Sequence, residues 1–307
     1  MNVRILLGLV LCAAARAQEL RPGDLELTLE IGGRTRRALV HAPRSYRFGT
    51  PTPVVLAFHG GGGNAESLIE MSRLDETADR EGFLVVYPDG TGRFARRLLT
   101  WNAGLCCGWA AENGIDDVAF VRALLDDLTR RASVDPDRIY ATGMSNGAMM
   151  CYRLAAELSD RIAAIAPVAG GTGLPDPKPG RPVPIVHFHG TADQNYPFEG
   201  GVGDRSLSGT DFVSIPKTIA AWVAIDGCPA EPEVTRLPDA TDDDRTVRRE
   251  RYGPGKDGAE VVLYVIEGGT HSWPGGPVFR EGLLGEPTTD ISANDIMWAF
   301  FQAHPLR

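Results

Sequence analysis

The stretch from Ile139 to Met150, IYATGMSNGAMM, constrains the fold of this chain more than any other. Its first four residues have strand character, the next five read GMSNG, and a helical pattern follows. A G-x-S-x-G sequence between a strand and a helix is the context of a nucleophile elbow. The serine of such a sharp turn has a strained backbone, and only small residues fit two positions away on either side. The pattern therefore predicts that Ser145 is a nucleophile.

The same turn predicts one half of an oxyanion hole. It directs the backbone N–H of Asn146, and the N-terminus of the following helix, toward the place where an oxyanion would form. The second donor is expected from the loop His59–Asn64, HGGGGN, since glycines there expose N–H groups and admit substrate closely. We expect Gly61 to be this donor, with Gly62 as the alternative. The loop lacks the lysine of a P-loop and the spacing of a dinucleotide-binding loop.

Apolar runs alternate with helical patterns along the chain. This alternation predicts an α/β fold, an α/β-hydrolase with a mostly parallel central sheet and helices on both faces. A hairpin over residues 24–42 is expected at the sheet edge, and two polar strands are expected near 233–237 and 246–252. A long loop is expected from Pro88 to Gly114. The apolar runs are Val54–Phe58, Phe83–Tyr87, Ile162–Val168, Ile185–His189 and Val261–Ile266, and the helical patterns cover 64–80, 116–131, 215–225 and 291–302.

A serine nucleophile needs a base and an orienting acid, which follow in the order Ser, Asp, His in this topology. Of the six histidines, only His271 comes just after the last apolar strand, in a glycine-rich loop that can bend toward the serine. Asp193 follows the strand that ends at His189, on a short tether suited to a rigid orienting group. The alternatives on the same loop are Glu199, Asp204 and Asp211.

Composition limits the partners and the compartment. The chain has 307 residues and a formal net charge of −9, with no basic patch, which argues against nucleic acid. Arg4, the short apolar run Ile5–Ala15 and the small residues Ala15 and Ala17 predict a signal peptide over 1–17, followed by one catalytic domain over 18–307. No later segment is apolar enough to span a membrane. We therefore expect a secreted protein, extracellular or periplasmic.

Four cysteines remain after this leader: Cys106, Cys107, Cys151 and Cys228. An even number in an exported chain favours disulfides, and four cysteines allow three pairings. Adjacent cysteines without a C-x-x-C spacing or nearby histidines do not suit zinc, so no metal site is expected.

Seven short segments together resemble the secreted feruloyl-esterase and polyhydroxybutyrate-depolymerase group of α/β-hydrolases. The resemblance covers nearly the whole mature chain. It implies hydrolysis of carboxylic esters through an acyl-enzyme, without a cofactor, with Ser145, Asp193 and His271 in the matching positions. The segments are His59–Gly62, Trp101–Gly104 with Cys106–Gly108, Asp116–Val118, Tyr140–Gly147, Ala166–Gly170, His189–Asp193 and Gly269–His271.

The cysteines depart from this group in one place. Relatives often carry a cysteine late in the elbow helix, where this chain has Ala156, and Cys151 stands earlier instead. Cys151 lies about 9 Å along the helix from Ser145 at roughly 1.5 Å per residue, on the active-site side. Cys228 follows a helix that runs back to the opposite side. We therefore expect a disulfide from Cys106 or Cys107 to Cys151.

The expected function is that of a serine carboxylesterase acting on a small or oligomeric ester. Trp101, Trp109 and Trp273 stand on loops near the site, where they line a pocket for a phenolic acyl group or pack the loops onto the core. Together with the absence of a linker after the terminal helix, this favours feruloyl-type esters over an insoluble polyester. The alternatives are a hydroxyalkanoate depolymerase, an acyltransferase, and a non-catalytic binding protein on the same fold. The oligomeric state is open.

Overall fold

The computed structural model describes residues 19–241 and 243–306. The predicted leader over 1–17 lies outside the described residues. The strands are β1 (Gly23–Ile31), β2 (Arg34–Ala42), β3 (Thr52–Phe58), β4 (Leu84–Pro88), β5 (Val134–Met144), β6 (Ala164–Val168), β7 (Ile185–Gly190), β8 (Glu233–Arg236), β9 (Thr246–Tyr252) and β10 (Val261–Glu267). The helices are α1 (Ala65–Ser72), α2 (Leu74–Glu81), α3 (Gly108–Glu112), α4 (Asp117–Arg131), α5 (Asn146–Glu157), α6 (Ile215–Asp226), α7 (Glu281–Leu284) and α8 (Ala293–Ala303), with a 3₁₀ turn η1 (Lys256–Gly258).

One sheet holds all ten of these strands, in the order β1-β2-β4-β3-β5-β6-β7-β10-β9-β8. The central strands from β4 to β10 run parallel to one another. An antiparallel hairpin closes each edge: β1 and β2 join at β4, and β9 and β8 join at β10. The mostly parallel sheet, the N-terminal edge hairpin and the two polar strands are therefore as predicted.

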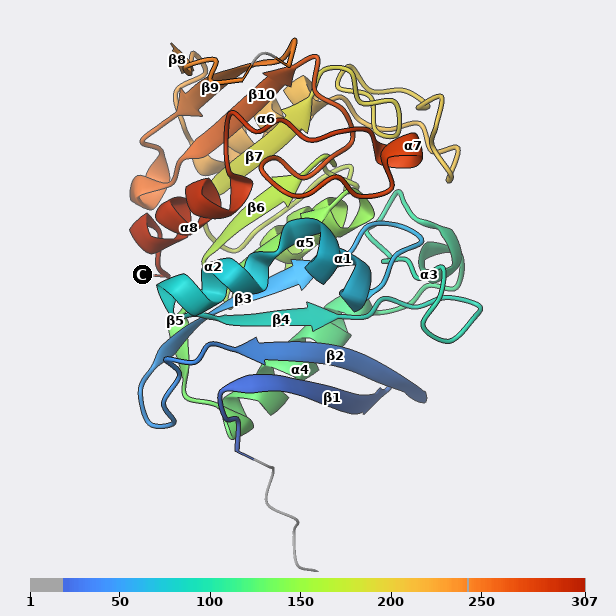
Figure 1. Cartoon of the computed structure of the whole chain (residues 1–307), viewed down its shortest axis with the longest axis vertical. Helices are drawn as coiled ribbons and strands as arrows, with labels where there is room; N and C mark the ends of the chain where they lie inside the picture. Colours follow the sequence, from blue (N-terminus) through green and yellow to red (C-terminus); the bar gives the residue numbers. More distant parts are fainter. Residues whose placement is uncertain (1–18, 242, 307) are drawn as a thin grey trace, which may run out of the picture.

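Side chains alternate between the two faces of the sheet. On β3, Val54, Leu56 and Phe58 enter one apolar cluster, while Val55 and Ala57 enter the other. Helices α4, α5 and α6 cover the first face, and α1, α2 and α8 cover the second (Figure 1). A strand that is buried on both faces consists of a continuous run of apolar residues. This explains why these strands could be predicted from the sequence.

The structure divides the predicted helical region 64–80 into α1 and α2. Asn64 caps α1 through a capping box with Ser67, and Arg73 then adopts a left-handed conformation with φ of 48°. That conformation ends a helix, since it turns the chain away from the helical path. A second difference is α3, a short helix within the predicted long loop 88–114.

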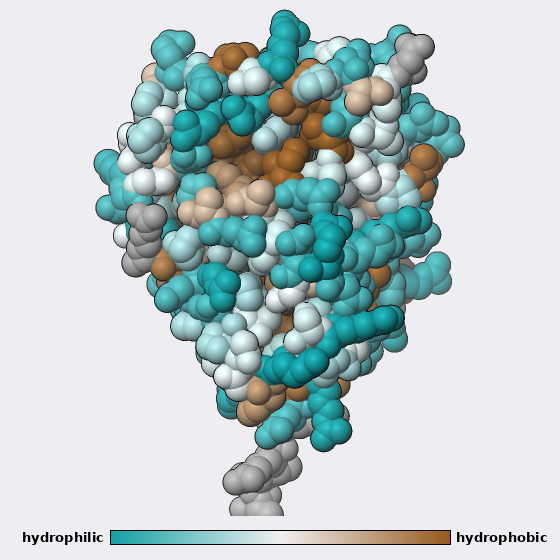
Figure 2. Space-filling view, turned by 60° about the vertical axis from the view of Figure 1, so that its left-hand side comes forward, coloured by the Kyte–Doolittle hydropathy of each residue, from teal (hydrophilic) through white to brown (hydrophobic). Residues whose placement is uncertain are grey.

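The carboxyl ends of the parallel strands define the edge where a site is expected in an α/β sheet. In Figure 1 the arrowheads of β3 and β4 point toward the side of the molecule that carries α3 and α7. Figure 2 shows another face, where hydrophobic residues gather in the upper part among hydrophilic ones. None of the helices in the described segments is long and apolar enough to cross a bilayer.

Candidate active site

Ser145 stands alone between β5, which ends at Met144, and α5, which begins at Asn146. Its φ of 58° and ψ of −116° lie outside the regions that non-glycine residues ordinarily occupy. Its N–H donates to Val168 O at 2.8 Å, which ties the turn to the neighbouring strand β6. A non-glycine residue that its surroundings hold in such a strained conformation is often found at a functional site.

The small residues around Ser145 are required by close packing of backbone. A Cβ on Gly147 would lie 2.1 Å from Phe58 O, and one on Gly143 would lie 2.7 Å from the same oxygen. A Cβ on Gly170, after β6, would lie 2.3 Å from Ser145 O. Side-chain atoms cannot occupy these spaces, so β3, β5 and β6 approach the elbow only because glycine stands at each position.

The glycine loop after β3 lies against the elbow. A Cβ on Gly61 would contact Asn146 Cβ at 3.7 Å. Gly62 N–H donates to Leu99 O at 2.8 Å, and Gly63 N–H donates to Gly60 O at 3.0 Å. These bonds engage the two donors that follow Gly61, whereas Gly61 N–H has no backbone partner among the described residues. Of the two candidates for the second oxyanion donor, Gly61 is thus the one with a free N–H.

Asp193 and His271 meet across the ends of β7 and β10. His271 Nδ1 lies 2.6 Å from Asp193 Oδ2. The N–H groups of Asn195 and Tyr196 donate to Asp193 Oδ1 at 2.8 and 2.9 Å, which fixes the carboxylate in a tight turn. Burial opposes ionisation of this carboxyl, but the charge and hydrogen bond of His271 hold the pKa of Asp193 below its usual value.

The alternative acids lie elsewhere. Glu199, Asp204 and Asp211 are exposed, whereas Asp193 is buried. An exposed carboxylate is free to move and is solvated by water, so it orients an imidazole poorly.

Ser145 and His271 both line one cavity of about 330 Å³. The described structure contains no hydrogen bond between them, and in sites without bound substrate catalytic hydrogen bonds are often long. Gly60 to Gly63, Asn146 and Trp109 also line this cavity. The sequence carries no signal for other lining residues, because they come from separate helices and loops and share no motif; they are Met71, Leu98, Met149, Leu207, Phe212, Arg280, Leu283 and Leu284.

Of the three tryptophans predicted to bind substrate, Trp109 lies on the cavity wall, and the prediction for Trp101 and Trp273 is corrected. Trp101 is fully buried; its indole N–H donates to His59 O at 3.0 Å and its ring packs against Phe58. Trp273 is 2% exposed, and its indole N–H donates to Asn294 Oδ1. Neither lines the cavity. Both rings anchor loops onto the core, the role that large aromatics with a satisfied N–H often have.

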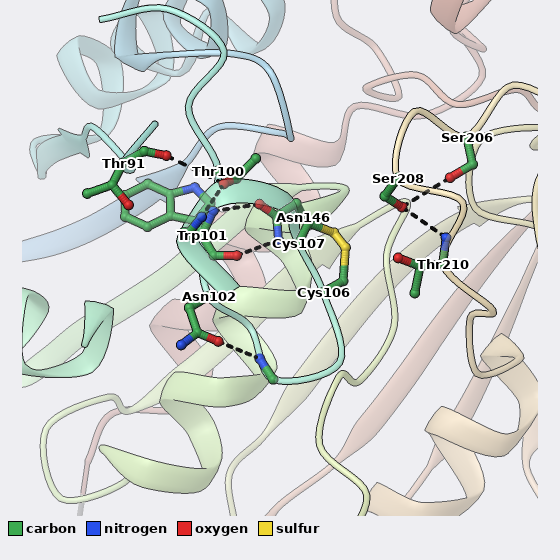
Figure 3. The surroundings of a disulfide bond; sticks show 12 residues. Thr91, Thr100, Trp101, Asn102, Cys106, Cys107, Asn146, Ser206, Ser208 and Thr210 are labelled. Carbon is green, nitrogen blue, oxygen red and sulfur yellow. Dashed lines mark hydrogen bonds between the residues drawn. A yellow bond between two sulfur atoms is a disulfide. The ribbon is translucent and has the colours of Figure 1, made fainter. Parts of the chain in front are cut away.

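The predicted disulfide partner is wrong in this structure. Cys106 pairs with its neighbour Cys107, next to Trp101 (Figure 3). Cys151 is a free, fully buried thiol within the apolar cluster under α5. Cys107 lines the cavity, so the adjacent pair forms part of its wall. Across the described residues, no cluster of three or more histidine, cysteine or acidic side chains is arranged to hold a metal ion.

Comparisons with known proteins show which family this chain resembles. The profile of the family described as "Esterase PHB depolymerase" matches residues 45–173. The "Putative esterase NocK" of Nocardia uniformis subsp. tsuyamanensis is 32% identical over 286 residues, covering 86% of this chain and 78% of that protein. Feruloyl esterase B of Piromyces equi is 32% identical over 249 residues, covering 77% of this chain but 42% of that longer protein.

Solved structures share the architecture at low sequence identity. An acetyl xylan esterase from Aspergillus awamori has a TM-score of 0.58 at 14% identity, covering 90% of this chain and 99% of that one. Esterase 2 of Thermogutta terrifontis, phosphorylated by paraoxon, has a TM-score of 0.54 at 14% identity, covering 92% and 94%. These likenesses confirm the predicted α/β-hydrolase fold.

Proposed function

The chain belongs to the esterase/PHB depolymerase family of α/β-hydrolases and is a carboxylesterase, and from this we propose that Ser145, His271 and Asp193 form its catalytic triad. The observation that carries the proposal is the 2.6 Å hydrogen bond from His271 Nδ1 to a buried Asp193, with the opposite side of His271 in the cavity that Ser145 lines. Residues 18–307 would then act as one catalytic domain, since all the described strands share one sheet.

The reaction proceeds in two acyl-transfer steps. His271 Nε2 takes the Ser145 proton as Oγ attacks the ester carbonyl, and Asp193 stabilises the imidazolium that forms. The N–H groups of Asn146 and Gly61 stabilise the oxyanion. His271 then protonates the departing alcohol, and it next activates water to release the acid. This chemistry uses protein groups and water, and needs no cofactor.

For the substrate, we propose a feruloyl-type ester. A cavity of about 330 Å³ is at the small end of the usual range for ligand pockets, about 300–1,000 Å³, so it suits one aryl-acyl group. Trp109 and Phe279 are two of the four aromatic side chains that line this cavity, together with Tyr196 and Phe212. The Arg34 guanidinium lies 5.0 Å from the centre of the Trp109 ring, which holds the indole in place. Stacking on such a ring adds about 0.5–1.5 kcal/mol beyond area burial.

A hydroxyalkanoate ester is the second candidate, and a specific feature favours it. Leu98 and Leu207 line the cavity and are 62% and 79% exposed. Leu283 and Leu284 on α7 complete an aliphatic rim. A rim of exposed leucines has no ring on which an aryl group can stack, but it suits an aliphatic chain.

The test compares kcat/KM for methyl ferulate, p-nitrophenyl acetate and soluble hydroxybutyrate oligomers, in the wild type and in Trp109→Leu. We expect methyl ferulate to be the best substrate, and the variant to lose this preference while it keeps its activity on the acetate. Leu207→Ala, which shortens an aliphatic side chain that lines the same cavity, is the matched control and should keep the preference. Oligomers turned over faster than ferulate, with no effect of Trp109→Leu, would favour the hydroxyalkanoate instead.

We also propose that the protein is secreted with cleavage after Ala17. Arg4, the apolar run 5–15 and the small residues Ala15 and Ala17 support this. N-terminal sequencing of the mature protein should begin at Gln18. A protein that retains Met1 in the cell would contradict the proposal.

A further inference from the structure

Strand β7 places two histidines in an otherwise apolar face of the sheet. His187 and His189 follow Ile185 at a period of two, so all three side chains point to the face that α5 and α6 cover. The two histidines are 0% and 1% exposed. A buried imidazole is costly unless its ring nitrogens are hydrogen-bonded, so their partners indicate what these residues do.

The hydrogen bonds of the two rings form one continuous chain. Tyr152 Oη, on α5, lies 2.9 Å from His187 Nδ1. His187 Nε2 lies 3.3 Å from His189 Nδ1. His189 Nε2 lies 2.9 Å from Tyr196 O and 3.4 Å from Asp193 Oδ2. The chain therefore begins at α5 and ends at the acid of the proposed triad.

The direction of this chain is fixed by its last partner. Burial lowers the pKa of both histidines, so each ring is neutral and carries one N–H. A backbone carbonyl only accepts, so His189 must carry its proton on Nε2 and accept at Nδ1. His187 must then donate from Nε2 and accept at Nδ1 from the Tyr152 hydroxyl. Every donor in the chain thus points toward Asp193, and aligned donors of this kind strengthen one another.

His189 contacts the turn that contains Asp193, and it does so on the other side of the carboxylate from His271. Its Nε2–H donates to Tyr196 O, while Tyr196 N–H donates to Asp193 Oδ1, so one residue of the turn is fixed at both backbone groups. The same Nε2–H approaches Oδ2, the oxygen that His271 Nδ1 contacts. Asp193 therefore lies between two imidazoles, that of His271, which lines the cavity, and that of His189, which does not.

We propose that His189, held in one tautomer by His187 and Tyr152, is a positioning residue that fixes the Asp193 carboxylate against His271. The inference rests on the proposed triad. It adds to the triad a buried chain of hydrogen bonds, called the relay below, that runs from Tyr152 through His187 and His189 to Asp193. His189 touches no substrate; it acts through the geometry of Asp193. A displacement of about 1 Å in a catalytic group costs on the order of 10²-fold in rate, so a loosened Asp193 turn should be visible in kcat.

The test compares His189→Gln with His189→Leu. The glutamine amide nitrogen stands as many bonds from the backbone as His189 Nε2 and donates in the same direction, whereas leucine fills the space without a donor. We expect His189→Leu to lower kcat on the order of 10²-fold with KM little changed, and His189→Gln to recover most of that loss. The initial burst of p-nitrophenol gives the concentration of protein whose Ser145 can be acylated. Each rate is divided by this concentration, so that misfolded protein does not contribute.

A spectroscopic measurement separates positioning from simple stability. The proton shared by His271 Nδ1 and Asp193 should give a far-downfield proton NMR signal in the wild type and in His189→Gln, and this signal should be shifted or lost in His189→Leu. Equal kcat and equal signals in the glutamine and leucine variants would overturn the proposal. The proposal would also be overturned if kcat fell in both variants in proportion to the fall in their melting temperatures, because that result would indicate a loss of stability alone.

Tyr152→Phe tests the far end of the relay. The phenyl ring keeps the volume and removes the hydroxyl that donates to His187 Nδ1. The loss in kcat should be smaller than in His189→Leu, because Tyr196 O still selects the tautomer of His189. A larger loss than in His189→Leu would contradict the assigned direction. If the wild type hydrolysed no ester, the proposed function would fail; if it hydrolysed esters and His189→Leu matched it, only the relay would fail.

Discussion

The side chain of Asn146 and the backbone of Trp101 exchange two hydrogen bonds. Trp101 N–H donates to Asn146 Oδ1 at 2.7 Å, and Asn146 Nδ2 donates to Trp101 O at 3.1 Å (Figure 3). Asn146, the residue that follows Ser145, therefore also holds in place the loop that forms one wall of the cavity.

Replacement of Asn146 by alanine should destabilise the protein although the backbone N–H of residue 146 remains. The buried N–H of Trp101 would lose its partner, at about 1–3 kcal/mol for an unsatisfied group, whereas Trp101 O would still accept from Cys107 N–H. Urea unfolding of Asn146→Ala measures this loss. Asn113→Ala is the matched control, because Asn113 is exposed on the same loop and its side chain bonds only locally to Trp109 O. Equal stability of the two variants would contradict the structural role of Asn146.

Replacement of Ser145 by alanine should abolish ester hydrolysis and leave the fold intact. Loss of a serine nucleophile typically costs on the order of 10⁶ in kcat. Initial rates and circular dichroism on the same preparation give the two readouts. Ser206→Ala is the control, since Ser206 lines the same cavity at a distance from the elbow in sequence. A folded Ser145→Ala protein with substantial turnover would rule out the proposed nucleophile.

Asparagine at position 193 should lower kcat about 10⁴-fold, because an amide favours the wrong tautomer of His271. Asp211→Asn changes an exposed carboxylate on the loop that follows and should leave kcat unchanged. The assignment of the acid is wrong if Asp211→Asn is the crippling change and Asp193→Asn is mild.

Stability should depend on the ionisation of Asp226. Burial raises the pKa of Asp226 to about 7, and the Val183 N–H and the charges of Arg181 and Lys256 offset only part of this effect. The unfolded chain has the ordinary pKa of 3.8, so between pH 3.8 and about 7 the folded state binds more protons than the unfolded state. The free energy of unfolding must therefore fall as pH rises through this window.

Asp226→Asn removes this titration. Oδ1 accepts from Val183 N–H in the wild type, and the asparagine oxygen can keep that bond. Thermal unfolding at about pH 5 and about pH 8 should show a smaller fall in melting temperature for the variant than for the wild type. An unchanged fall would show that Asp226 does not titrate in this range.

The cysteines can be tested by mass. A tryptic peptide that contains Cys106 and Cys107 should lack two hydrogens relative to its reduced form, since the two sulfurs pair with each other. Cys151 should react with a thiol reagent only after denaturation, because it is fully buried. A non-reduced peptide pair that links Cys151 to Cys106 or Cys107 would contradict the structure.

The sheet and the triad candidates could be predicted because local chemistry determines them. Gly143 and Gly147 are required because the elbow packs closely on itself and on Phe58 O, and the G-x-S-x-G pattern records this requirement in five consecutive residues. Asp193 and His271 follow β7 and β10, which are neighbours in the sheet. The central strands could also be predicted from the sequence, because burial on both faces requires apolar residues at successive positions.

Trp101 and Cys151 could not be placed from the sequence because their orientation depends on distant partners. The loop that carries Trp101 is held by Asn146, 45 residues later in the chain. The rise along α5 gave the depth of Cys151, but not the side of the helix on which it lies, and that side faces the apolar cluster. The break at Arg73 was missed because the apolar pattern continues through it.

The floor and the walls of the cavity differ in how far they can be changed. The floor around Ser145 is built from backbone contacts so close that a single added methyl group on Gly147 would collide with Phe58 O. The walls come from separate loops, and Leu98 and Leu207 present exposed side chains there. A library that randomises Leu98, Leu207 and Leu283 would therefore explore new ester substrates on an unaltered catalytic floor, whereas one that includes Gly147 would yield chains unable to assemble the elbow.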